Sequence, residues 1–235
     1  MTLDKLIYDV REGLNQYGDD SEISDLYIIY LFGIKRAKYL RQDLNNYQRT
    51  FDNSVTQTLC IDLEEVSANE CGIDYECDTI LRTTKRIPKP LELHTKVALS
   101  SVKPTNRIAV GFNFITKKRA SYLGGATFSR AIYSFLDPDG YIYVVSGPDN
   151  NHFKLLECLT ISGIFEEPLD LREFVDCCGC ATAAPCFDSS TTDYPLQPHF
   201  IDIIKQEIIS DLVIKLRIPE DKINDSNDNE PSTQN

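Results

Sequence analysis

Three stretches of the chain carry hydrophobic residues at the spacing of an α-helix. The first begins after Thr2, which is suited to cap a helix, and is predicted to end near Gly18. The last begins at Pro198, which fits the first turn of a helix, and ends before Pro219. The apolar positions are Leu3, Leu6, Ile7, Val10 and Leu14 in the first stretch, and Phe200, Ile203, Ile204, Ile208, Leu212 and Leu216 in the last.

The second helix, predicted over residues 21–46, is apolar almost all round in its first half. Ser21 or Ser24 caps it, and the part from Ile23 to Ile34 has few polar positions. One interpretation is a core helix that emerges into solvent at its more basic second half. The other is a helix whose exposed apolar surface contacts another subunit.

From Leu59 onward the hydrophobic pattern changes to a period of two, which is typical of half-buried β-strands. The predicted strands are Leu59–Leu63, Thr79–Ile87, Ile108–Ile115, Ala131–Leu136, Tyr141–Ser146 and Lys154–Phe165. Asp137 to Gly140 indicate a hairpin turn, because Pro138 presets φ and glycine accepts a positive φ. Pro88 and Pro90 exclude their segment from the centre of a sheet. The middle of the chain is therefore predicted to be a small, mainly antiparallel β module.

We predict an α+β fold in which the N- and C-terminal helices pack as a helical bundle with this β module inserted between them. The expected parts are an N-terminal helical part (1–58), a β-rich inserted module (59–167), a C-terminal helical part (168–218) and a flexible acidic tail (219–235). A short helix is expected around Leu169–Val175. The tail is polar and almost free of aliphatic residues, so we expect it to be disordered when the protein is alone.

The net charge of −12 disfavours nucleic acid as a binding partner. Residues 218–235 hold five acids and one lysine, a contribution of −4. An acidic chain resists non-specific binding to duplex DNA, because phosphate contacts need lysine and arginine. No stretch approaches the roughly 18 apolar residues of a membrane-spanning helix, and the first residues lack the features of a secretory signal. We therefore expect a chain made in a cytoplasm, with reduced thiols and no membrane partner.

The residues best suited to bind a metal or carry redox chemistry are concentrated at positions 176–186, which hold four of the eight cysteines. Structural zinc sites usually combine two cysteine pairs at C-x2–4-C spacing. Cys71 and Cys77 are separated by five residues, so zinc held by these two and two of the cysteines from Cys177 to Cys186 is the minor alternative. Cys177 and Cys180 match C-x-x-C but lack the βαβ setting of a redox motif. The favoured interpretation is a loop that holds no metal and carries no redox chemistry.

No catalytic constellation emerges from the other candidates. These are the histidines His94, His152 and His199, the pair Gly124-Gly125, and the carboxylate pairs Glu64-Glu65 and Glu166-Glu167. The histidines have no partner at metal or triad spacing, and the two glycines lack a phosphate-loop pattern. The carboxylate pairs are interpreted as solvated strand ends. We therefore expect a protein that is not an enzyme, without catalytic residues, a cofactor or a metal.

Several segments occur in an order that points to one kind of protein. They are DKLIYDVREGL, DDSEISDLYIIYLFGIKRAKYLRQDLNNYQRT, CIDLEEVSANEC, ILRTTKRIPKPLEL and the closing PHFIDIIKQEIISDLVIKLRIPEDKINDSNDN. This order resembles neck proteins of tailed bacteriophages, and most closely the ring or head-to-tail adaptor proteins of crAss-like and related phages. The resemblance covers most of the chain, apart from Val97–Leu123 and Cys177–Asp193.

The resemblance implies a structural virion protein that forms a homo-oligomeric ring, typically a dodecamer, and joins the capsid portal to the tail. It also implies a helical bundle with a C-terminal segment that reaches the portal. The implied partners are the portal protein and other neck or tail ring proteins, and genomic DNA passes through the ring without sequence-specific binding. A ring needs head-to-tail contacts, which the apolar helix Tyr27–Ile34 is suited to supply. The alternative is another neck or tail ring. Either protein belongs to the virion and is assembled in the host bacterial cytoplasm.

Overall fold

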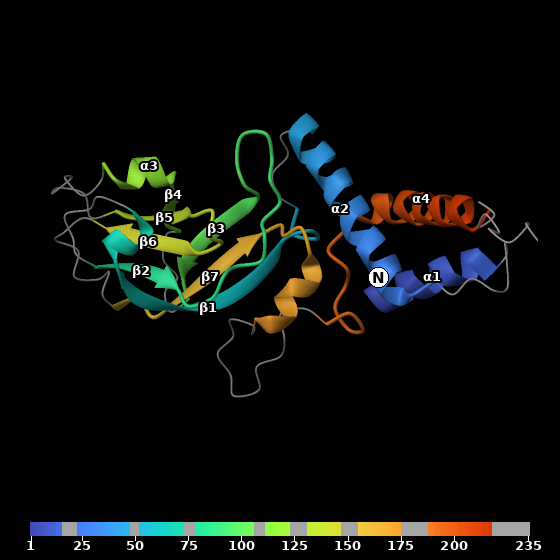
Figure 1. The fold of residues 1–235 in the computed structure, drawn as a ribbon, viewed down its shortest axis with the longest axis horizontal. Helices are drawn as coiled ribbons and strands as arrows, with labels where there is room; N and C mark the ends of the chain where they lie inside the picture. The colour runs from blue at the N-terminus through green and yellow to red at the C-terminus, as the bar shows by residue number, and fades with distance from the viewer. Residues whose placement is uncertain are drawn as a thin grey trace, which may run out of the picture.

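A computed structural model describes residues 1–15, 23–47, 52–72, 79–105, 111–122, 131–146, 155–174 and 188–217. A large β-sheet lies at one end of the long axis, and three long helices lie together at the other (Figure 1). The predicted tail after Pro219 and the cysteine-rich loop at 176–186 lie outside the described residues.

The three long helices form where the apolar spacing predicts them. They are α1 (Leu3–Asn15), α2 (Asp25–Tyr47) and α4 (Pro198–Arg217). The five apolar residues of the first predicted helix all lie in the buried face of α1, and Pro198 is the first residue of α4, as its fixed φ favours. A single-turn helix, α3 (Lys117–Ala120), lies against the sheet at the opposite end of the molecule (Figure 1).

The sheet has seven strands in the order β3-β7-β1-β2-β6-β5-β4. The strands are β1 (Gln57–Ser67), β2 (Thr79–Thr83), β3 (Leu99–Pro104), β4 (Asn113–Phe114), β5 (Ile132–Leu136), β6 (Ile142–Ser146) and β7 (Cys158–Gly163). The long strand β1 is central, because its first half pairs with β7 and its second half with β2. All pairs are antiparallel except β4 with β5.

The prediction of a helical bundle with a small inserted β module is wrong. The seven-stranded sheet is the dominant component of the described structure, and it curves into a nearly closed, barrel-like shape. The sequence pattern underestimated the sheet because several strands are short or irregular. Strand β3 was missed altogether, since it contains Ser100 and Ser101, has a register shift between Leu99 and Ser101, and ends at Pro104.

Two predictions concern segments that connect the main elements: a hairpin turn and a short helix. The turn from Asp137 to Gly140 is confirmed: the Gly140 amide donates to the Asp137 carbonyl at 3.0 Å, and Gly140 has a φ of +87°. The short helix expected around residue 170 is a 3₁₀ helix spanning Pro168–Glu173, not an α-helix. It lies between the sheet and the long helices (Figure 1).

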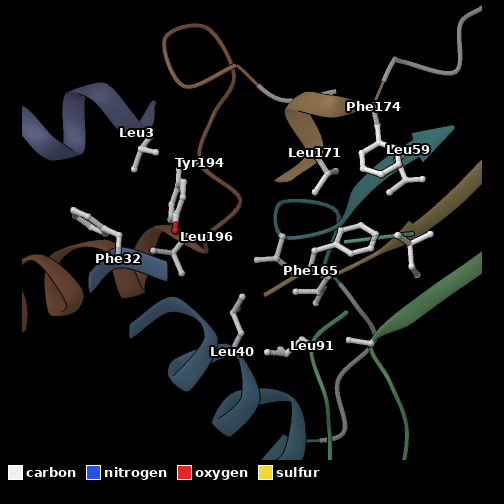
Figure 2. Close-up of a cluster of buried hydrophobic side chains, with 14 of the residues drawn as sticks. Leu3, Phe32, Leu40, Leu59, Leu91, Phe165, Leu171, Phe174, Tyr194 and Leu196 are labelled. Atoms are coloured by element: carbon white, nitrogen blue, oxygen red, sulfur yellow. The ribbon is translucent and has the colours of Figure 1, made fainter. Parts of the chain in front are cut away.

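One hydrophobic core joins the helices to one face of the sheet. Figure 2 shows side chains from α1, α2, β1, the segment after β7 and the segment before α4 gathered in a single cluster. Phe165 and Leu171 are fully buried in it, between Leu59 of the sheet and Leu40 of α2. A second, smaller cluster, centred on Phe135 and Tyr143, whose rings stack 5.3 Å apart, includes Ala120 of α3. The helical end and the sheet therefore share one main core and form a single unit.

Arg36 is a fully buried charged residue at the centre of this junction. Its Nε donates to the Pro195 carbonyl at 2.7 Å, and its Nη1 donates to the Phe165 carbonyl at 2.7 Å. Burial lowers the pKa of the Arg36 guanidinium to about 10, so it stays charged at neutral pH. One side chain thus binds α2 both to the chain leaving the sheet and to the chain entering α4.

Gly163 at the end of β7 is a position where the sheet tolerates no side chain. A Cβ there would lie 2.7 Å from the Ala98 carbonyl oxygen and 2.9 Å from Leu99 Cδ2. We expect Gly163→Ala to lower the free energy of unfolding by about 1 to 3 kcal/mol, because backbone must shift to admit the methyl group. Chemical denaturation measures this, with Gly111→Ala as the control, since the nearest atom to its added Cβ is 3.5 Å away. Equal stability of the two variants would contradict the close approach.

Candidate subunit interface

Helix α2 presents three large hydrophobic side chains to solvent along one stripe. Leu26, Tyr30 and Ile34 are 78%, 54% and 45% exposed, and their spacing of four residues places them on the same side of the helix. We call these three residues the α2 face. Two residues between them, Ile28 and Phe32, are fully buried on the opposite side. One side of the helix is therefore core, and the other exposes an apolar surface, whose contact with another subunit stays a prediction.

Charged contacts with α4 fix the orientation of the α2 face. Lys35 Nζ lies 3.0 Å from Glu207 Oε2 and 2.7 Å from Asp211 Oδ2. Tyr39 donates its hydroxyl hydrogen to Glu207 Oε1. Near the start of α2, Lys215 Nζ lies 4.3 Å from the centre of the Tyr27 ring. These contacts use the side of α2 next to the face and leave the face itself uncovered.

These contacts also make the α2–α4 pairing sensitive to acid. The Tyr39 hydrogen bond and the nearby Lys35 lower the pKa of Glu207 below its ordinary 4.5. The ionised carboxylate therefore stabilises the fold at pH above 4.5, and we expect this contribution to be lost as pH falls through the lowered pKa. Thermal unfolding from pH 7 to pH 3 tests it: Glu207→Gln should show a smaller loss of stability on acidification than wild type. An identical pH profile for the two proteins would exclude this role.

Helix α1 extends the apolar surface beside the start of α2. Tyr8 is 62% exposed, and Arg11 pairs with Asp25, the first residue of α2. Tyr8 and Arg11 line a pocket of about 160 Å³ together with Ile23. The sequence did not single out Tyr8, although its position opposite the buried stripe of α1 was readable from the 3.6-residue period.

The cysteines give no support to a zinc site within the described residues. No group of three or more His, Cys, Asp or Glu side chains that could hold a metal occurs there. The side chain of Cys71, and Cys77 and all four cysteines from Cys177 to Cys186, lie outside what the structure describes, so the zinc alternative is not tested on its own residues. Cys60 is disulfide-bonded, contrary to the expectation of reduced thiols.

Cys158 in β7 is a free thiol that we expect to be chemically inert. Burial and a hydrogen bond to Asp62 Oδ1 at 3.0 Å raise the pKa of Cys158 to about 11. Because the thiolate is the reactive form, its fraction at pH 8 should be about a hundredfold smaller than for an ordinary thiol. Iodoacetamide labelling followed by peptide mass spectrometry measures this. Asp62→Asn should speed the labelling of Cys158, and labelling as fast in the folded as in the denatured protein would contradict the expectation.

The remaining candidates from the sequence do not assemble into a site. His94 and His199 are exposed, while His152 and the pair Gly124-Gly125 lie outside the described residues. In the carboxylate pairs Glu65 and Glu167 are exposed, whereas Glu64 forms an ion pair with Arg82, and Glu166 forms ion pairs with Arg41 and Lys89. Among the described helices, none is long and apolar enough to cross a membrane.

Comparison with known proteins identifies the class of molecule that carries this surface. Residues 5–230 match the family described as "Phage tail ring protein 2". The chain belongs to this family. It is also 26% identical to "Ring protein 2" of Bacteroides phage crAss001, over 235 residues that cover the whole of both chains.

Membership of the family confirms the resemblance to ring proteins of crAss-like phages. A ring protein 2 family member is a structural component of the virion, and its name describes an assembly of subunits. The exposed α2 face is therefore a candidate assembly surface, because large uncovered apolar patches mark contacts with other proteins.

Proposed function

We propose that this protein is a head-to-tail adaptor: a ring of identical subunits that joins the capsid portal to the tail. The α2 face carries the proposal. Three large apolar side chains in line on one helix are costly to leave in water, and contact with a neighbouring subunit removes them from it. Membership of a ring protein family supports the same arrangement.

A closed ring constrains where such a surface must bind. Each subunit uses one patch to contact a different patch on the next subunit, and the ring closes when the rotation between neighbours divides a full turn. The α2 face lies on a helix that is fixed in the core by Arg36 and on α4 by Lys35, so it is presented rigidly. Rigid presentation lowers the entropic cost of association.

The proposed assembly has a dodecameric ring, with the portal protein on one side and other neck or tail ring proteins on the other. Genomic DNA passes through its channel without sequence-specific binding. The net charge of −12 supports this, because a surface of the same charge as DNA lets the genome slide instead of adhering. Assembly takes place in the host bacterial cytoplasm.

Native mass spectrometry of the chain mixed with the portal oligomer encoded near it tests the adaptor position. The expected result is a rise in portal mass by a full ring of 26.7 kDa subunits. The control is the chain with its α2 face disrupted, Leu26→Asp with Tyr30→Asp, which should add no complete ring. A wild-type chain that adds no mass to the portal would contradict the adaptor position.

The second candidate is a ring placed further down the neck or tail. The observation that favours it is the name of the family, "Phage tail ring protein 2", which refers to a ring of the tail. In that case the chain binds another ring protein of the virion and leaves the portal unchanged. Mixing it with each neighbouring ring protein in turn, under the same conditions, distinguishes the two positions.

A further inference from the structure

An open pocket lies between the segment that follows β2 and the 3₁₀ helix at Pro168–Glu173. Its volume is about 460 Å³, within the range of about 300–1,000 Å³ found for ligand pockets. We call it the Tyr141 pocket. Its lining includes one aromatic ring, two bases and two acids: Tyr141, Lys85, Arg86, Asp170 and Glu173.

The four charged residues of the Tyr141 pocket are exposed and form no ion pair with any described residue. The bases belong to the segment after β2 and the acids to the 3₁₀ helix, so the pocket separates the two signs. Arg86 is held by Tyr141, whose ring centre lies 5.8 Å from the guanidinium carbon. Burial raises the pKa of Asp170 above its ordinary 3.8, and the neighbouring Glu173 raises it further. Within the described structure the two acids therefore lack a base that would stabilise them as carboxylates.

This arrangement selects an occupant that carries charges of both signs close together. A purely anionic ligand would pair with the two bases, but the two acids on the other side of the pocket would repel it. A purely cationic ligand would pair with the acids and be repelled by the bases. A short stretch of chain with neighbouring acids and a base pairs with both sides.

One segment outside the described residues has this pattern. In the tail, Glu220 and Asp221 are directly followed by Lys222, and we call Pro219–Lys222 the PEDK segment. Two adjacent acids combined with a base occur in none of the other segments outside the described residues, which are 16–22, 48–51, 73–78, 106–110, 123–130, 147–154 and 175–187. Among these parts of the chain, the tail therefore fits the pocket best.

The PEDK segment of the same chain falls short of the pocket. Helix α4 begins near the junction with the sheet and runs away from it to the far end of the long axis (Figure 1). Its 20 residues carry the chain about 30 Å in that direction, at about 1.5 Å per residue. Lys222 follows Arg217, the last residue of α4, by five positions, which span at most about 17 Å. A neighbouring copy has no such limit.

We infer that the Tyr141 pocket binds the PEDK segment of a neighbouring copy of this chain. The two acids of the segment pair with the two bases of the pocket, and its lysine pairs with the two acids of the pocket. The inference rests on the proposed function, since it requires identical subunits side by side in a ring. Each copy then donates its tail to one neighbour and receives the tail of the other, which is a head-to-tail contact that repeats around a closed ring.

The rival occupant is duplex DNA, which bases beside an aromatic ring also bind. The net charge of −12 opposes the approach of DNA and of a second copy alike, so it does not select between them. The selection is local. DNA brings only negative charge to the pocket, so Asp170 and Glu173 would repel it, whereas the PEDK segment brings Lys222 to them.

Zero-length carbodiimide cross-linking of purified phage particles tests the contact in the assembled protein. The reagent joins a lysine only to a carboxylate in direct contact, so we expect peptides that link Lys85 to Glu220 or Asp221. Lys103, an exposed lysine of β3, is the control and should not link to either acid. A tail that links to the portal or to another virion protein, and not to Lys85, would overturn the inference.

Charge reversal tests the pairing in the full chain. We call Lys85→Glu with Arg86→Glu the pocket variant, and Glu220→Lys with Asp221→Lys the tail variant. Each should reduce incorporation of the chain into particles by about tenfold, because like charges then oppose each other. The four changes in one chain should restore incorporation. Lys103→Glu with Lys118→Glu is the matched control, since it makes the same change in charge at exposed bases outside the pocket and should leave incorporation unchanged.

Mixing the two variants shows which copy donates the tail. If the contact joins neighbouring copies, the pocket variant and the tail variant expressed together should enter particles better than either alone, because alternating copies restore every pair. If only the four changes in one chain restore incorporation, the tail binds its own pocket and the inference is overturned.

The remaining outcomes separate the inference from the proposed function. If the wild-type chain is absent from particles, both fall. If it is present and both variants enter particles as well as wild type, at equal melting temperatures, the tail contact is refuted while the ring itself stands. If a duplex DNA probe binds the wild-type chain and the pocket variant does not bind it, DNA is the occupant and the inference is overturned.

Discussion

Arg36→Met is expected to lower the free energy of unfolding by about 2 to 5 kcal/mol, the largest stability loss of any single charged residue discussed here. Methionine keeps the apolar stem of the side chain but donates no hydrogen bond. The carbonyls of Pro195 and Phe165 would lose their donor in a buried site, and an unsatisfied buried acceptor is costly. Urea denaturation followed by circular dichroism measures the difference.

Arg41→Met is the matched control for Arg36. Arg41 lies on the same helix and pairs with Glu166, but its side chain is 44% exposed. Solvent screens that pair, so its loss should cost less than about 1 kcal/mol. If the two variants lose equal stability, Arg36 does not act as the junction between the helices and the sheet.

Leu26→Asp combined with Tyr30→Asp is expected to weaken ring formation by more than about tenfold without unfolding the chain. Both side chains are exposed in the single subunit, so the change leaves the core intact. In an assembled ring it would bury two carboxylates in an apolar contact, which removes much of the binding energy. Incorporation into phage particles, measured by quantitative mass spectrometry of the virion, gives the effect on assembly.

Leu155→Asp provides the control for the α2 face. Leu155 is also a large exposed hydrophobic residue, at 68%, but it precedes β7 and does not belong to the α2 face. It should leave incorporation unchanged. Equal incorporation of wild type and the double α2 variant, at equal melting temperatures, would show that α2 contacts no neighbour.

The long helices were predictable because each keeps a 3.6-residue apolar period over several turns. The buried positions of α1 match that period residue by residue. The double character of α2 was also visible in the sequence as an excess of apolar residues, but not which side faces solvent. That side is decided by Arg36 and Lys35, whose partners are distant in the chain, and local patterns do not contain such contacts.

The size and curvature of the sheet were not predictable in the same way. Of the strand predicted at Ile108–Ile115, only Asn113–Phe114 (β4) is a strand among the described residues, and β3 contains serines and a proline that weaken the strand signal.

Electron cryomicroscopy of the intact phage neck and tail tests the central claim of a ring closed by head-to-tail contacts between identical subunits. The account predicts a closed ring beside the portal, in which the α2 face of each copy is covered by the next copy. Single copies, copies paired back to back, or a ring in which Leu26, Tyr30 and Ile34 remain in solvent would contradict it.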